Sequence, residues 1–320
     1  MGFNRFPQGL MRLSSIDIGT NTILMLIADV QPNGEIHVAR DEHFIARLGK
    51  GVDEHRRILP ETFERVLQCL SHYKQIHEEA RSERILACGT SALRDAANRE
   101  EFIEFIKSRL GFEITVLSGD KEAELTYLGS VSDFLQEGLR QSFVVIDIGG
   151  GSTELTYGIS RAVTSKRSLD IGSVRLTERF LKSSPPDESS LHGATEYIRE
   201  HAKDYPVLEE GTRCIGVAGT LTTLAAIDLQ LHVYDRARVS GHVLSLDVIQ
   251  KIYERLKDKR LEEIKAIPQI LPQRADIILA GILILCELMN QIGVDRITAS
   301  DRGLRYGILM NEANQLTAGG

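Results

Sequence analysis

The sequence contains little cysteine. Its 320 residues include four cysteines, which stand far apart in apolar contexts and form no Cys-x-x-Cys pair: Cys69, Cys88, Cys214 and Cys286. Small secreted domains rely on dense disulfide pairing, and structural zinc sites need clustered ligands. The pattern therefore excludes both, and it is typical of core thiols in a reducing cytoplasm.

Long hydrophobic runs are absent as well. The longest, from Ile277 to Met289, is too short to cross a bilayer and predicts a buried helix. The first twelve residues have no apolar core of the kind that a signal peptide needs, and Phe6 stands where an N-myristoylation motif has Ser or Thr. We therefore expect a soluble protein of the cytoplasm without membrane partners.

Positive charge is in deficit. The chain has 38 Lys and Arg against 45 Asp and Glu, a formal net charge of −7, which argues against binding nucleic acid through a broad basic surface. A polyanionic substrate would have to be drawn in by a local basic lining. A hydrophobic content of 42% and a length of 320 residues fit a globular chain of two domains, each able to bury a core.

The most informative stretch is FVVIDIGGGSTE, from Phe143 to Glu154. The β-branched and aromatic residues at its start predict a strand that is covered on both faces, and Asp147 stands where that strand ends. The glycine triplet that follows can take positive φ and has no Cβ, so its N–H groups can turn inward to cradle an anion. A plain hairpin between two core strands is the alternative.

A second copy of this design favours the anion cradle. The stretch SIDIGTNT also combines an apolar strand, an acid and a glycine turn, and its Asp17 precedes Asp147 by 130 residues. Gly89 and Gly219, each at the end of an apolar strand and followed by Thr, are again 130 residues apart. Two motifs at one offset predict a duplicated domain. A looser third pair, ITVLS and ITAS, predicts an insertion of about 52 residues in the second copy.

Six motifs in chain order resemble the Ppx/GppA family of exopolyphosphatases and guanosine pentaphosphate phosphohydrolases. They are DIGTNT, GTSALRDAAN, SGDKEAELTYLG, DIGGGSTEL, GVAGTLTTLAA and SDRGLRYGIL, and the resemblance runs from about Arg12 to about Leu309. It implies an α/β fold of two ribonuclease H-like lobes of the actin, sugar kinase and Hsp70 ATPase fold, with an interdomain cleft. The expected domains are an N-terminal actin-like ATPase-type lobe, residues 12–127, and a C-terminal actin-like lobe with a helical insertion, residues 128–311.

The resemblance also implies the roles of individual residues. Glu122 is implied as the catalytic base, because a carboxylate in a partly dehydrated cleft can deprotonate a water for in-line attack on a terminal phosphoryl group. Glu154 is implied as a second catalytic carboxylate, and Asp17, Asp147 and Glu154 as ligands of Mg²⁺. The implied phosphate-binding residues are Gly19, Thr20, Asn21, Thr22, Arg94, Gly149, Gly150, Gly151, Ser152, Thr153, Gly219 and Thr220.

Three of these residues also have simpler interpretations. For Glu154 the alternative is a position on a surface strand. A glutamate in the first turn of a helix, as expected for Glu122, can do no more than complement the helix dipole. Arg94 can be a surface residue paired with Asp95 or Glu101, or it can reach a phosphate bound near the N-terminus of its helix.

Other charged residues bear on the local basic lining that a polyanionic substrate would need. Where the family often has Glu-Glu-Ala-Arg, this chain has Lys121-Glu122-Ala123-Glu124, and Glu124 adds negative charge near a polyanion site. Arg175 is a candidate for the lining, whereas Arg274 is expected in a simple ion pair.

The implied activity is hydrolysis of a phosphoanhydride. The terminal orthophosphate of inorganic polyphosphate, or the 5′ γ-phosphate of pppGpp, would leave by Mg²⁺-assisted attack of a water activated by Glu122. The alternatives are an ATP-dependent kinase of the same superfamily and a regulatory protein that binds (p)ppGpp without turnover. The SGDKEAEL segment, which sugar kinases and Hsp70-like ATPases lack in that place, favours the hydrolase. The sequence does not rank polyphosphate against pppGpp, and its apolar helical insertion is compatible with a homodimer.

Overall fold

The computed structural model describes residues 11–31, 35–203, 205 and 208–318. The sequence Pro32-Asn33-Gly34, which is typical of a turn, lies outside these residues. The chain divides into two compact units: Met1–Gly129 with Leu304–Gly320, and Ser130–Gly303. We call them the first and the second unit. The chain thus enters the second unit close to the predicted boundary, but its last segment belongs to the first unit and not, as expected for residues 304–311, to the second.

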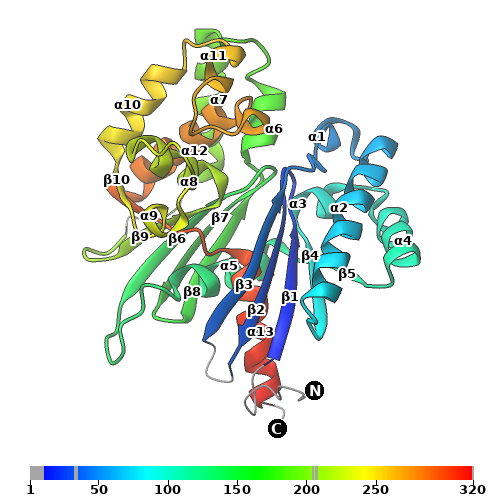
Figure 1. Cartoon of the computed structure of the whole chain (residues 1–320). Coiled ribbons are helices and arrows are strands. Elements are labelled where there is room, and N and C mark those ends of the chain that lie inside the picture. Colours follow the sequence, from blue (N-terminus) through cyan, green and yellow to red (C-terminus); the bar gives the residue numbers. More distant parts are fainter. Residues whose placement is uncertain (1–10, 32–34, 204, 206–207, 319–320) are drawn as a thin grey trace. The chain divides into compact units, whose positions relative to one another are not determined.

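The first unit is built on a five-stranded sheet with the order β3-β2-β1-β4-β5 (Figure 1). The first three strands form antiparallel pairs, and β4 and β5 continue the sheet in parallel with β1. The strands are β1 (Met11–Ile18), β2 (Ile23–Val30), β3 (Ile36–Phe44), β4 (Arg84–Gly89) and β5 (Ile114–Val116). The helices are α1 (Val52–His55), α2 (Pro60–Glu79), α3 (Ser91–Asp95), α4 (Arg99–Leu110), α5 (Gly119–Val131) and α13 (Leu304–Ala318).

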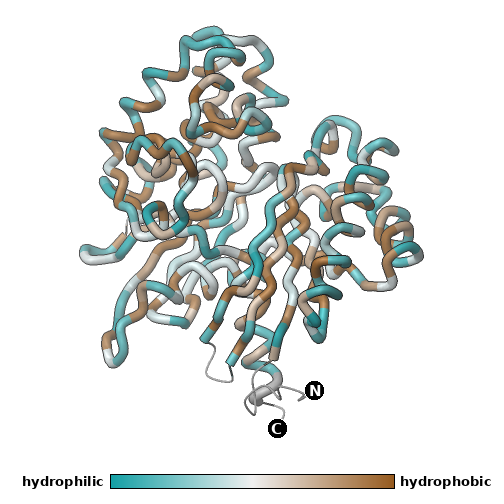
Figure 2. The backbone as a smooth tube through the Cα atoms, viewed as in Figure 1, coloured by the Kyte–Doolittle hydropathy of each residue, from teal (hydrophilic) through white to brown (hydrophobic). Residues whose placement is uncertain are grey.

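Different helices cover the two faces of this sheet. Successive side chains of a strand point to opposite faces, so Ile16 and Ile18 of β1 pack in the core that contains Tyr73 of α2. Leu13, on the other face, packs with Tyr306 of α13. Helix α2 alternates between hydrophobic and hydrophilic residues along its length (Figure 2), as expected for a helix with one face on a sheet.

Helix α13 joins the first unit through close packing. Ser15 of β1 donates a hydrogen bond from Oγ to the carbonyl oxygen of Arg305 at 2.8 Å. A Cβ on Gly307 would overlap the carbonyl oxygen of Leu125 in α5, so glycine permits the close approach of the two helices. These contacts explain why the C-terminal segment departs from the predicted domain boundary: it supplies the helix that one face of the first sheet needs.

The second unit repeats the first sheet. Its six strands have the order β10-β11-β9-β6-β7-β8 (Figure 1). Read from β8, the first five follow the pattern of β3-β2-β1-β4-β5, with β10 added at the edge. The strands are β6 (Ser142–Ile148), β7 (Thr153–Ile159), β8 (Ala162–Leu169), β9 (Arg213–Val217), β10 (Val243–Ser245) and β11 (Arg296–Ala299). The predicted duplication and α/β fold class are therefore confirmed.

The predicted helical insertion lies between β9 and β11. The helices of the second unit are α6 (Ser173–Arg179), α7 (Glu188–Ala202), α8 (Ala218–Asp228), α9 (Arg236–Val239), α10 (Leu246–Leu256), α11 (Leu261–Lys265) and α12 (Ile278–Ile292), with a 3₁₀ turn at Pro272–Arg274. Helix α12 is buried along most of its length, as its apolar sequence predicted. Within the described ranges, no helix is both long and apolar enough to span a membrane. All four cysteines are buried thiols.

Candidate functional site

Both glycine turns have the same hydrogen-bonded geometry. In the first unit, Gly19 N–H donates to the carbonyl oxygen of Thr22 at 3.0 Å, and in the second, Gly149 N–H donates to that of Ser152 at 3.0 Å. A Cβ on Gly19 would lie 2.8 Å from the Thr22 oxygen, and one on Gly149 would lie 3.0 Å from the Ser152 oxygen. Both turns therefore require glycine at their first position.

Each turn has two adjacent backbone donors that no protein group uses. In the part of the chain that the structure describes, the N–H groups of Thr20 and Asn21, and those of Gly150 and Gly151, donate to no backbone or side-chain acceptor. Adjacent N–H groups that point to one side of a turn form an anion-binding concavity. The predicted phosphate-binding turns thus have the donors that this role needs.

The loop between β3 and α1 fixes the first turn from its carbonyl side. Gly49 N–H donates to Thr20 O at 2.8 Å, and Arg47 N–H donates to Asn21 O at 2.9 Å. Arg65 of α2 in turn donates from Nε to Ala46 O at 2.6 Å. The turn is thereby tied to a long helix on the sheet.

Asp147 and Glu154 stand opposite each other on the antiparallel strands β6 and β7. Directly opposed residues of such a pair project from the same face of the sheet, with Cβ atoms about 5 Å apart. Glu154 is 2% exposed, and its Oε1 accepts a hydrogen bond from Ser168 Oγ at 2.7 Å. Two carboxylates on one face repel each other unless a cation or proton lies between them, and hard oxygen donors suit Mg²⁺.

The structure does not assemble a complete metal cage from one unit. Among the described residues, no group of three or more His, Cys, Asp or Glu side chains is placed so that it could hold a metal ion. Asp17, the third predicted ligand, belongs to the first unit, whereas Asp147 and Glu154 belong to the second. Mg²⁺ commonly keeps several waters and takes one or two carboxylates, so the Asp147 and Glu154 pair fits that ion.

Glu122 lies near the N-terminus of α5, where Ser118 receives the Lys121 N–H on its Oγ at 3.2 Å. Glu122 is 7% exposed, and its side chain forms an ion pair with Arg94 of α3. Burial raises the pKa of Glu122, although the charge and the hydrogen bond of Arg94 act against the rise. A buried carboxylate with a raised pKa is the usual form of a general base or acid in an active site.

Cys88 connects Glu122 with Asp17 in the first unit. Burial raises the pKa of the Cys88 thiol to about 12, and the negative charges of Asp17 and Glu122 add to the rise. Both carboxylates therefore lie close to this thiol. The structure thus gathers Asp17, Glu122 and Arg94 around the ends of β1 and β4.

Arg94 pairs with Glu122 in the structure. Its Nη1 donates to the carbonyl oxygen of Leu117 at 3.1 Å and to the Glu122 carboxylate. Nearby, Lys121 Nζ lies 2.9 Å from Glu124 Oε1. The negative charge of Glu124, unexpected beside a polyanion site, is therefore balanced locally.

The third turn predicted to bind phosphate, at Gly219 and Thr220, opens helix α8. Arg274 packs so closely on Gly219 that a Cβ there would overlap its guanidinium, and Thr220 packs on Gly281 of α12. Burial lowers the pKa of Arg274. A cation at a helix N-terminus strengthens an anion site. Arg274 thus lies against a glycine that stands more than 50 residues earlier in the chain.

Two other predicted site residues hold the second turn rather than face solvent. Thr153 is fully buried, and its hydroxyl donates to Ile171 O at 2.6 Å. Arg175, a candidate for the basic lining, is 6% exposed and donates from Nε to Gly151 O at 2.7 Å. Sequence spacing does not reveal this inward orientation. It depends on Gly172, the residue directly before helix α6, which approaches the Gly150 carbonyl so closely that a Cβ would not fit.

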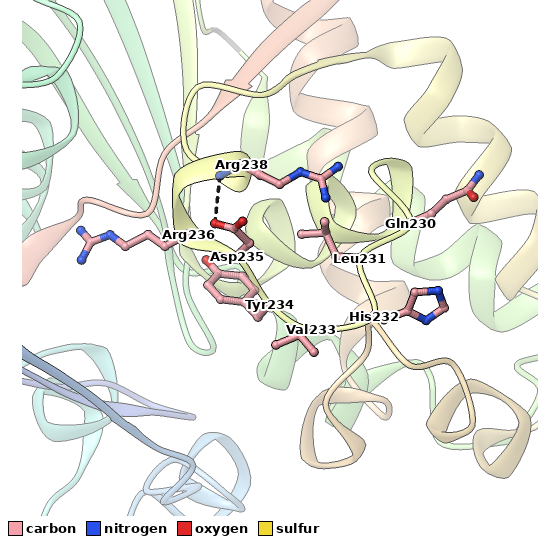
Figure 3. Close-up of a pocket in the computed structure, with 8 residues that line it drawn as sticks. All are labelled: Gln230, Leu231, His232, Val233, Tyr234, Asp235, Arg236 and Arg238. Carbon is pink, nitrogen blue, oxygen red and sulfur yellow. Dashed lines mark hydrogen bonds between the residues drawn. The ribbon is translucent and has the colours of Figure 1, made fainter.

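A pocket of about 480 Å³ lies in the second unit between α8 and α9 (Figure 3). It is lined by Gln230, Leu231, His232, Val233, Tyr234, Asp235, Arg236 and Arg238. Arg236 and Arg238 extend in different directions (Figure 3), and Arg236 forms an ion pair with Asp301. None of the predicted site residues lines this pocket, although Tyr234 lies near enough to Arg274 to act on its pKa.

The comparison with known families shows to which family the chain belongs. The Ppx/GppA phosphatase family profile matches residues 26–316. The chain belongs to the Ppx/GppA phosphatase family. Exopolyphosphatase 2 of Mycobacterium tuberculosis is 36% identical over 322 residues, which cover 96% of this chain and all of that protein.

Two further Ppx/GppA relatives extend the comparison. The guanosine-5'-triphosphate,3'-diphosphate pyrophosphatase of Vibrio parahaemolyticus is 28% identical and matches 95% of this chain but 59% of its own length. The crystal structure of the Aquifex aeolicus member of the Ppx/GppA family has a TM-score of 0.81 and 33% sequence identity, covering 96% of this chain and 99% of that one. The fold expected from the motifs is thus the fold of this family.

Proposed function

We propose that the protein is a phosphoanhydride hydrolase that releases the terminal orthophosphate of inorganic polyphosphate. The observation that carries the proposal is Glu122, a buried carboxylate with a raised pKa on the capped end of α5, in contact with Arg94. A kinase needs no base of this kind for water, and a binding protein needs none at all.

In the proposed reaction, Glu122 takes the proton of the attacking water. A positioned base of this type contributes about 10²–10⁴-fold to a rate. The adjacent N–H donors of the two glycine turns, together with Arg94, Arg274 and the N-terminus of α8, would bind phosphate oxygens and balance their charge. These local donors offset the net charge of −7, which otherwise disfavours a polyanion.

Phosphatases of this family generally depend on a divalent metal ion, and we propose Mg²⁺. Asp147 and Glu154 would hold it with two carboxylate oxygens, and Asp17 is proposed as a further ligand. Bound there, Mg²⁺ would neutralise charge that develops on the transferred phosphoryl group. The Glu154 carboxylate, kept in place by Ser168, would also orient the water.

Polyphosphate is the first candidate substrate, because the match to an exopolyphosphatase extends over that whole protein. The second candidate is pppGpp, since the similarity to a guanosine-5'-triphosphate,3'-diphosphate pyrophosphatase covers 95% of this chain. In both cases the same bond type is broken: a terminal phosphoanhydride. The two substrates differ in the part of the molecule that lies beyond the reacting phosphates, so contacts to that part would decide which substrate is preferred.

The test is a phosphate-release assay across tripolyphosphate, longer polyphosphates, pppGpp, GTP and ATP, with Mg²⁺ and with EDTA. We expect Mg²⁺-dependent release that is fastest from polyphosphate. Faster release from pppGpp would replace the substrate proposal while retaining the reaction. Phosphoryl transfer to an acceptor, with no orthophosphate released, would contradict the hydrolase itself.

A further inference from the structure

Helix α6 binds the carbonyl side of the second glycine turn. Ser173 donates to Gly149 O from its N–H at 2.9 Å and from its Oγ at 3.2 Å. Val174 N–H donates to Gly150 O at 2.8 Å, and Arg175 N–H donates to the same oxygen at 3.1 Å. The first turn of α6 therefore uses its own unsatisfied N–H groups on the loop.

The third carbonyl of the turn, that of Gly151, is bound by a side chain. Arg175 Nε donates to Gly151 O at 2.7 Å. The bond is buried, because Arg175 is 6% exposed and Gly151 is buried too. Gly172 makes room for this arrangement: a Cβ there would overlap the Gly150 carbonyl. The Arg175 side chain thus binds the loop backbone through Nε.

These carbonyl contacts determine where the N–H groups of the turn point. A peptide unit is planar and trans, so the C=O of one residue and the N–H of the next point in opposite directions. Binding of Gly149 O and Gly150 O by α6 therefore directs the N–H groups of Gly150 and Gly151 away from the helix. The Arg175 bond directs the N–H of Ser152 to that same side. Three consecutive glycines would otherwise sample many conformations.

We propose that Arg175 is a positioning residue: its Nε hydrogen bond fixes the Gly151–Ser152 peptide and so orients the anion cradle for a phosphate of the substrate. The phosphate part of this proposal rests on the function proposed above. The orientation of the turn does not, because it follows from hydrogen bonds within the second unit alone. Arg175 acts through the loop and does not touch the substrate.

Two substitutions of nearly equal length separate the hydrogen bond from the charge. In glutamine, the amide nitrogen occupies the place along the side chain that Nε has in arginine, whereas in methionine that place is a methyl carbon. We expect Arg175→Met to raise the KM for tripolyphosphate, and to weaken binding of a non-hydrolysable imido analogue, by about tenfold, the value of one lost hydrogen bond. Arg175→Gln should stay within about threefold of wild type.

A role as a plain cation predicts no difference between the two variants. Arg175→Met and Arg175→Gln would then weaken substrate and analogue binding equally, because both lose the charge, and that result would overturn the proposal. Arg179→Met is the matched control, since it removes an arginine from the same helix that packs on the Tyr197 ring instead of the loop. It should leave KM and analogue binding unchanged.

A second readout is independent of hydrolysis. The N–H of Gly149 donates within the turn, and the N–H of Val174 donates from α6 to the turn. Amide hydrogen exchange at both should become about tenfold faster in Arg175→Met and stay unchanged in Arg175→Gln. Equal exchange in the two variants would refute the positioning role even if the wild type hydrolysed none of the substrates tested.

If Arg175→Met fails to fold, Gly172→Ala tests the same contacts between α6 and the second glycine turn with Arg175 in place. Its added Cβ would overlap the Gly150 carbonyl, so we expect faster exchange at Gly149 and weaker analogue binding. Unchanged exchange and binding in a folded Gly172→Ala protein would overturn the inference. Absence of phosphate release by the wild type, with intact exchange differences, would instead count only against the proposed function.

Discussion

At the scale of single residues, Glu122 and Glu124 form a natural pair for comparison. They lie two residues apart at the start of α5, but Glu122 is buried against Arg94 whereas Glu124 is partly exposed beside Lys121. We predict that Glu122→Gln lowers kcat for phosphate release at least about 100-fold, as loss of a general base does, while analogue binding persists. Glu124→Gln should keep wild-type turnover. Near-wild-type turnover of Glu122→Gln would remove the base from the mechanism.

A second residue-scale prediction concerns the ion pair between Asp41 of β3 and Arg305 of α13. Burial alone would raise the pKa of Asp41, but the hydrogen bond from His43 and the charge of Arg305 lower it to about 2. A folded-state pKa below the unfolded value means that the stabilisation is present above pH 4 and is lost as the pH falls toward 2. Asp41→Asn, which removes the negative charge beside the buried guanidinium of Arg305, should lower the free energy of unfolding by about 3 kcal/mol at pH 7.

The pH dependence is the diagnostic part of that prediction. Urea unfolding should show the largest difference in free energy of unfolding between wild type and Asp41→Asn at neutral pH. This gap in stability should become smaller as the pH drops below about 4. Asp247→Asn, which breaks an exposed pair with Lys251, should show no comparable gap at any pH. A gap that stays constant down to pH 3 would show that the charge of Asp41 is not what stabilises the fold.

At the scale of secondary-structure elements, the crossing of α5 and α13 limits what can replace Gly307. A Cβ at Gly307 would overlap the Leu125 carbonyl, a backbone atom that cannot rotate away, whereas a Cβ at Gly303 would meet nothing within 4 Å. We predict that Gly307→Ala lowers the free energy of unfolding by about 2 kcal/mol through overpacking. It should also slow phosphate release, because α5 carries Glu122. Thermal unfolding and turnover of Gly303→Ala, four residues earlier, should match the wild type.

Apolar runs in the sequence predicted individual elements well. Apolar strands that end in glycine turns located β1 and β6, and the apolar run from Ile277 located α12. Side-chain direction at the site was less predictable. Arg175 and Thr153 hold the loop instead of facing outward, because their orientation depends on contacts with residues that are distant in sequence.

At the scale of the whole molecule, the duplicated motifs predicted the two sheets, and the difference between their offsets predicted the insertion before β11. The place of the C-terminal segment was not predictable in this way. The motif SDRGLRYGIL follows β11 of the second unit without any linker, so its sequence shows no boundary. Tertiary packing assigns it: Tyr306 and Leu309 complete a core with strand residues of the first sheet.

This assignment predicts which half of the chain a C-terminal truncation damages. Deletion after Gly303 would remove α13 and expose Leu13, Leu26 and Val30, which are buried in the same core as Leu309. We expect hydrogen exchange to become fast throughout residues 11–129, while the core of residues 130–303, which contains α12, keeps its protection. Truncation after Leu309, which retains Tyr306, Gly307 and the start of the helix, should restore part of the lost protection. Loss of protection in residues 130–303 first would show that α13 stabilises the second unit, contrary to the packing described here.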